Sequence, residues 1–100
     1  MNSRLYVLCR KDMEYSSPAV QAGHAVAHYL LNRKEEGWSN ETLIYLGVKN
    51  LHELQKWCRK LDEHNIKWYG FKEPDYNDEL TAIAIPTDGR MKMFKHLKLL

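Results

Sequence analysis

Long apolar runs are missing from this sequence of 100 residues, and so are closely spaced cysteines and a strong charge of either sign. Without a run of about 18 apolar residues, we expect no helix that spans a membrane. Cys9 and Cys58 have no partners at metal-ligand spacing, so we expect two buried thiols and no metal site. The composition, 44% apolar and 28% charged, predicts one ordinary globular domain over residues 1–100.

Common nucleotide and hydrolase signatures are also lacking. The sequence has no glycine-rich phosphate loop, no Walker pattern and no G-x-S-x-G elbow, and we expect no cofactor. The acidic residues of 73–79 lack the regular spacing and the glycine of a calcium loop, so they do not predict a cation site. The first residues lead directly into a strand-like segment without the apolar core of a signal peptide, from which we expect a cytoplasmic protein.

The basic residues are unevenly distributed, although the formal net charge is only +2. After Asp88 the chain contains four lysines and arginines and no acidic residue. Basic pairs also occur at 10–11 and 33–34. A basic end is compatible with a polyanionic partner, but charge alone is explained better by an ordinary solvated surface.

Short apolar runs alternate with amphipathic stretches along the chain. Strands are predicted at 5–9, 42–48, 66–71 and 81–85, and helices at 18–31, at 51–64 and after Thr87 or Asp88, the last containing Met91, Phe94 and Leu97. The order β-α-β-α-β-β-α, with right-handed crossovers, predicts an α/β fold in three layers, an α/β/α sandwich around a mixed four-stranded sheet. The short turn between the last two strands predicts that they pair antiparallel.

The first helix has an unusual combination of small and polar residues. Ser17 is a suitable N-cap and Pro18 is suited to the first helical position. Gln21, His24 and His28 are spaced by three and four residues, which places them on one side of a helix otherwise rich in alanine. They are candidates for a functional site, and a hydrogen-bonded core histidine with a solvent-facing neighbour explains the pattern about equally well.

Three parts of the chain resemble the type II peptidyl-tRNA hydrolases of archaea and eukaryotes and their shorter bacterial and phage-like relatives. They are Val-Leu-Cys-Arg-Lys-Asp at 7–12, Ala-Val-Gln-Ala-Gly-His-Ala at 19–25, and the pair Thr-Ala-Ile-Ala-Ile-Pro at 81–86 with His-Leu-Lys-Leu-Leu at 96–100. The resemblance implies a single domain that hydrolyses the ester of peptidyl-tRNA and releases peptide and free tRNA. The implied partner is tRNA, and a homodimer is left open.

The resemblance also implies roles for individual residues. Asp12, Gln21 and His24 form the catalytic set, with His24 as proton acceptor, Asp12 as the carboxylate that orients it and Gln21 bound to the substrate amide or sugar. Glu73 or Asp75 stands, by approximate position, for an aspartate of a family loop. Further substrate contacts are predicted for His28 and, at the phosphates, for Arg10, Lys11, Arg90, Lys95 and Lys98.

The chain departs from the family at three places, one of them 73–75, where Glu-Pro-Asp replaces the Asp-Ala-Gly of the family loop, and this leaves alternatives open. The family usually places a lysine in a glycine-rich loop before this helix, whereas 14–18 contains neither lysine nor glycine. A family threonine before the terminal His-Leu-Lys is Phe94 or Lys95 here. One alternative is therefore a catalytically inactive RNA-binding module of the same fold, and another is a protein-interaction domain. Asp12 can equally serve as a turn cap.

Overall fold

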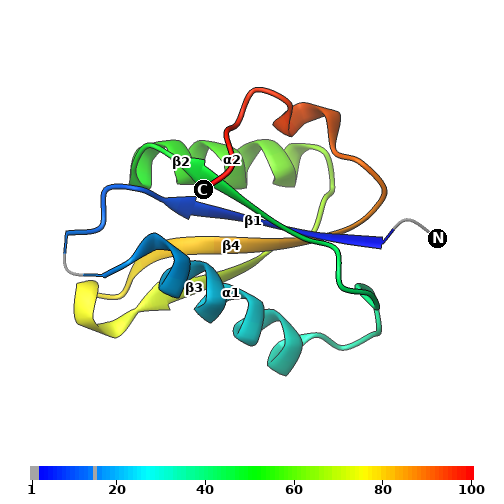
Figure 1. Cartoon of the computed structure of the whole chain (residues 1–100), viewed down its shortest axis with the longest axis horizontal. Helices are drawn as coiled ribbons and strands as arrows, with labels where there is room; N and C mark the ends of the chain where they lie inside the picture. The colour runs from blue at the N-terminus through cyan, green and yellow to red at the C-terminus, as the bar shows by residue number, and fades with distance from the viewer. Residues whose placement is uncertain (1–2, 15) are drawn as a thin grey trace.

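The computed structural model describes residues 3–14 and 16–100 (Figure 1). Its elements are β1 (Ser3–Arg10), α1 (Pro18–Asn32), β2 (Leu43–Val48), α2 (Leu51–Glu63), β3 (Tyr69–Glu73), the 3-10 turn η1 (Pro74–Tyr76), β4 (Glu79–Asp88) and the 3-10 turn η2 (Lys92–Phe94). The strands form one sheet in the order β2-β1-β4-β3. β1 and β2 are parallel, whereas β4 is antiparallel to both β1 and β3. The predicted α/β class and the order of the first six elements are confirmed.

The two helices cover opposite faces of the sheet, as the three-layer prediction requires (Figure 1). Alternate residues of β1 point to opposite sides, so Val7 belongs to the core under α1 and Leu8 to the core under α2. The residues that α1 buries are Gln21, Ala22, Ala25 and Tyr29, and the two alanines are fully buried against the sheet. The helix therefore lies close to the sheet.

The first helix begins as the sequence predicts, and asparagines cap both ends of α2. Ser17 accepts a hydrogen bond from the Ala19 N–H at 3.2 Å, with Pro18 in the first helical position. Asn50 caps α2 by accepting from the Glu53 N–H at 3.0 Å, and Asn65 ends it in the left-handed conformation, with φ of 56°. Neither helix, nor any other among the described residues, has the length and apolarity needed to cross a membrane.

The strands of the β3–β4 hairpin are displaced from their predicted bounds. β3 begins at Tyr69 because the Ile66 N–H still binds the Leu61 carbonyl at the end of α2, at 2.9 Å. β4 continues to Asp88, beyond Pro86, where we predicted its end. The Leu5 N–H donates to Thr42, toward β2, so Leu5 and Pro86 face each other without exchanging hydrogen bonds. The proline nitrogen therefore points away from β1, at a position of β4 that lies beyond the start of β3, so no donor is needed there.

The predicted last helix is wrong: only the 3-10 turn η2 forms after β4. Phe94 is buried against Tyr6 and Trp57 in the core under α2. The chain then extends along the outer edge of β2, where the Gly47 N–H donates to the Lys98 carbonyl and the Leu100 N–H to the Tyr45 carbonyl, both at 3.0 Å. The C-terminal segment thus forms backbone hydrogen bonds with the edge of β2, which would otherwise lack a neighbouring strand.

The close approach of α1 to the sheet can be tested with two alanines of the same helix. Ala25→Leu places extra atoms in a filled core and is expected to lower the free energy of unfolding by about 1–3 kcal/mol. Ala27 is exposed, so Ala27→Leu is expected to change it by less than about 0.5 kcal/mol. Urea unfolding followed by circular dichroism measures both, and equal losses would contradict this packing of α1.

Candidate functional site

Gln21 is the centre of a buried polar network between α1 and the sheet. Its side chain is fully buried, and its amide nitrogen donates to the Ser16 hydroxyl and to the Glu73 carboxylate, both at 3.0 Å. Its amide oxygen accepts from the Thr81 hydroxyl at 2.7 Å. Both amide hydrogens are therefore engaged, and Gln21 joins α1 to β3 and β4 instead of facing a substrate.

Thr81 reaches this network through an irregularity in the sheet. Phe71 pairs with Ala82 and Lys72 pairs with Leu80, so Thr81 is an extra residue of β4 at this point. A bulge of this kind redirects a side chain that strict alternation would place on the opposite face. Here it turns the Thr81 hydroxyl toward α1, where it meets Gln21.

His24 lies one turn after Gln21 and is half-buried. Its ring packs on the ring of Phe71 with centroids 4.7 Å apart, and it forms no hydrogen bond with any described residue. Beside it is an open hollow of about 470 Å³ along α1, lined by Val20, Gly23, His24, Ala27, His28, Leu31, Asn32 and Phe71. The Asn32 side chain bonds the His28 ring at 3.3 Å. His24 is thus presented beside a largely apolar hollow.

Arg10 is buried and fully engaged by neighbouring groups. It donates to both carboxylate oxygens of Asp12, at 2.9 and 3.0 Å, to Glu79 at 2.8 Å and to the Leu80 carbonyl at 3.1 Å. The hydrogen bonds from Arg10 lower the pKa of Asp12, and the same bonds raise the pKa of Arg10. In this arrangement Arg10 is not available for a phosphate, and the Asp12 carboxylate is directed to Arg10 with no hydrogen bond to His24.

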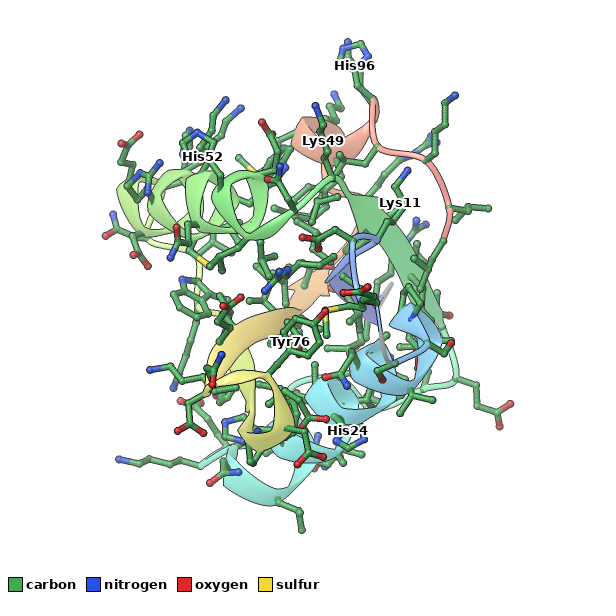
Figure 2. All side chains as sticks on the ribbon, turned by 90° about the vertical axis from the view of Figure 1, so that its left-hand side faces the viewer. Lys11, His24, Lys49, His52, Tyr76 and His96 are labelled. Atoms are coloured by element: carbon green, nitrogen blue, oxygen red, sulfur yellow. The ribbon has the colours of Figure 1, made fainter. Side chains whose placement is uncertain are left out.

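The loop after β1 is joined to the turn after β3. The Glu14 N–H donates to the Tyr76 hydroxyl at 3.0 Å, and the Tyr76 ring lies 5.8 Å from the Arg10 guanidinium. Figure 2 looks onto this end of the molecule, with Tyr76 near the middle, His24 below it and Lys11 above it. Tyr15 falls outside the described residues.

The remaining predicted site residues fall into separate groups. Glu73 joins the Gln21 network, whereas Asp75 is exposed in η1. Lys11 and Lys98 meet β2 through their backbones, at Val48 and Gly47. Arg90 and Lys95 line another hollow, of about 200 Å³, together with residues from the start of β1 and β2. The structure brings Gln21 and Glu73 together and places His24 one helical turn away on Phe71, whereas Arg90 and Lys95 line a separate hollow.

Several contributing residues were not predicted from the sequence. They are Ser16, Phe71, Tyr76, Glu79 and Thr81. Ser16 was within reach of pattern reasoning, since it precedes the helix that carries Gln21. The others come from β3, η1 and β4, and only the pairing of the sheet brings them to α1 and Arg10.

The thiols and the acidic residues do not form a second centre. Cys9 and Cys58 are buried and unpaired, as predicted, and burial raises the pKa of Cys9 to about 12 and that of Cys58 to about 11. Such thiols stay protonated at neutral pH. Within 3–14 and 16–100, no three histidine, cysteine or acidic side chains gather in a way that could hold a metal ion.

The ion pairs of Arg10 predict that two variants lose different amounts of stability. Asp12→Asn/Glu79→Gln leaves a buried guanidinium without a carboxylate and is expected to cost about 3–5 kcal/mol of stability. Arg10→Met removes the buried charge and leaves two carboxylates that are each 38% exposed, so it is expected to cost less. Chemical unfolding at pH 7 measures both, and an equal or reversed order would contradict this assignment.

The same pair predicts how stability depends on pH. Because the pKa of Asp12 lies below its ordinary value of 3.8 in the folded chain, its pairing stabilises the fold fully above about pH 4. This contribution is lost as the pH falls through the lowered pKa. The free energy of unfolding is therefore expected to fall less between pH 5 and pH 2 in Asp12→Asn than in the unmodified protein. Chemical unfolding over this range measures it, and an equal fall in both proteins would contradict the assignment.

Comparison with protein-family models and with curated proteins found no match. Among solved structures, the chain is similar to a protein of unknown function from Agrobacterium tumefaciens strain C58, with a TM-score of 0.65 and 12% sequence identity. The alignment covers 100% of this chain and 98% of that chain. At this identity the likeness extends to the fold and not to an activity.

Proposed function

We propose that the protein hydrolyses the ester of peptidyl-tRNA at His24 and releases peptide and free tRNA. The observation that carries the proposal is the His24 ring, which is held against Phe71, is without a hydrogen-bond partner among the described residues and faces an open hollow. It lies in the segment whose sequence resembles the type II peptidyl-tRNA hydrolases.

The imidazole of His24 has the chemistry that ester hydrolysis needs. A ring nitrogen accepts a proton from water as the water oxygen attacks the ester carbonyl carbon. The bond between that carbon and the ribose oxygen then breaks, and the proton passes to the departing ribose oxygen. No covalent intermediate on the protein is required, which agrees with the inert state of the buried thiols.

In this proposal Gln21 and Glu73 do not transfer the proton: Gln21 positions the site and Glu73 contacts the substrate. Gln21 is a positioning residue, because its amide is buried and holds β3 against α1 beside His24. Glu73 follows Phe71 by two residues on β3 and is half-buried, so its carboxylate faces the same side. It is the acidic group available to accept a hydrogen bond from the ribose or from the peptide amino group.

The substitution His24→Asn tests the proposal while keeping a polar side chain of moderate size. Loss of a general base typically lowers a rate by about 10²- to 10⁴-fold, and that loss is expected for peptide release from peptidyl-tRNA. The matched control is His64→Asn, an exposed histidine at the far end of α2, which is expected to cleave at the rate of the unmodified protein. Circular dichroism and urea unfolding check that both variants fold.

The outcome also separates the alternative of an RNA-binding module. Salt-dependent tRNA binding by the unmodified protein without any peptide release would support the inactive module and reject hydrolysis. Full activity of His24→Asn would remove His24 from the mechanism. Loss of activity in both histidine variants would point to a change in folding instead of chemistry.

A further inference from the structure

The carboxyl ends of β1 and β2 form a crevice that the proposed ester site does not use. The two strands are adjacent and parallel. The chain leaves β1 for α1 on one face of the sheet and leaves β2 for α2 on the other. In open α/β sheets, the point where neighbouring connections diverge to opposite faces is where ligands bind. A hollow of about 450 Å³ lies there, and we name it the switch-point crevice.

The switch-point crevice is lined by charged residues and by the apolar side chains of α2 and the end of β2. The lining includes Lys11 after β1, Gly47 at the end of β2, Lys49 after β2, and Glu53 and Trp57 of α2. Figure 2 shows Lys11 and Lys49 at this end of the molecule.

The two lysines carry charge that no neighbouring acid neutralises. Neither Lys11 nor Lys49 forms a salt bridge with a carboxylate of the described residues. Asp12 also lines the crevice, but both of its oxygens bind Arg10. Glu53 lies 3.9 Å from the Lys56 ammonium. Both carboxylates of the lining are thus directed to other cations, and the two lysine ammonium groups have no ion-pair partner among the described residues, which suits an anion.

Lys11 is held in place by the strand beside it. A Cβ atom at Gly47 would lie 2.7 Å from Cδ of Lys11, so the lysine stem occupies the space that a larger residue would take. The Lys11 N–H donates to the Val48 carbonyl at 2.9 Å, and the Gly47 N–H is bound by Lys98 at 3.0 Å. The backbone of Lys11 is thus anchored, and its side chain crosses β2 along the glycine.

We propose that the switch-point crevice binds a nucleotide phosphate, a monoester or a backbone diester, between Lys11 and Lys49. Two ammonium groups, one of them on a backbone that is hydrogen-bonded to β2, match a doubly or singly charged phosphate. This proposal rests on the proposed function only in naming tRNA as the molecule that carries the phosphate. Its binding is measured without cleavage, so the two proposals can fail separately.

The direct test titrates inorganic phosphate and adenosine monophosphate into the isotope-labelled protein. Amide signals of Lys11, Gly47 and Lys49 are expected to shift. Lys11→Gln/Lys49→Gln, which removes both charges and keeps polar side chains, is expected to weaken binding roughly tenfold or more. The matched control Lys34→Gln/Lys67→Gln removes the same charge beyond the end of α1 and before β3, and it is expected to bind as the unmodified protein does.

A second arm distinguishes the source of the phosphate. A single-stranded oligoribonucleotide ending in CCA is titrated at several salt concentrations, with and without a 5′-phosphate. For a backbone diester, replacing each lysine that binds a phosphate is expected to reduce the slope of log K against log salt by about 0.7. Dependence on the 5′-phosphate alone would assign the crevice to a monoester.

A third variant separates placement from charge. Gly47→Ala keeps both lysines but displaces the Lys11 stem, and it is expected to weaken phosphate binding several-fold with little loss of stability. His24→Asn is expected to bind phosphate normally, whatever its effect on cleavage. Phosphate shifts confined to other amides, or unchanged affinity in the double lysine variant, would overturn the proposal.

Discussion

The buried amide of Gln21 determines where α1 lies on the sheet, because its hydrogen bonds reach Ser16, Glu73 and Thr81. A buried amide without its partners would cost about 1–3 kcal/mol for each unsatisfied group, so the helix cannot shift by a turn without penalty. The small residues around Gln21 permit the close approach that these bonds need. His24, one turn further along, is consequently aligned with Phe71.

The segment 10–12 divides the same end of the sheet into two environments. Arg10 pairs with Asp12 and with Glu79, which fixes the loop that leads to α1. Lys11, between them, instead lies across Gly47 toward β2. Successive residues at the end of β1 and just after it thus have different roles. One pair holds the loop, and the intervening lysine keeps a charge without an ion-pair partner among the described residues.

Local signals in the sequence were sufficient for the helices, their caps and the alternating cores, since each depends on residues close in the chain. Residues that depend on strand pairing were not predictable in this way. Thr81 faces α1 only because of a bulge opposite Phe71. Arg10 looked like a surface phosphate ligand, yet Glu79 and Asp12 bury its charge. The basic chain end looked helical, but pairing with the edge of β2 is available only once the sheet has formed.

The distribution of charge suggests how one ligand would occupy both proposed sites. The hollow beside His24 is largely apolar, whereas the switch-point crevice is lined by two lysines without an ion-pair partner among the described residues. Between them lies the group of Arg10, Asp12 and Glu79, in which two carboxylates face one guanidinium, so it does not attract a phosphate. An acylated RNA end would therefore place its ester and acyl group along α1 and a phosphate between Lys11 and Lys49. The uncharged part of the ligand would then lie in the hollow along α1 and its phosphate in the switch-point crevice. Neither contact reads a base.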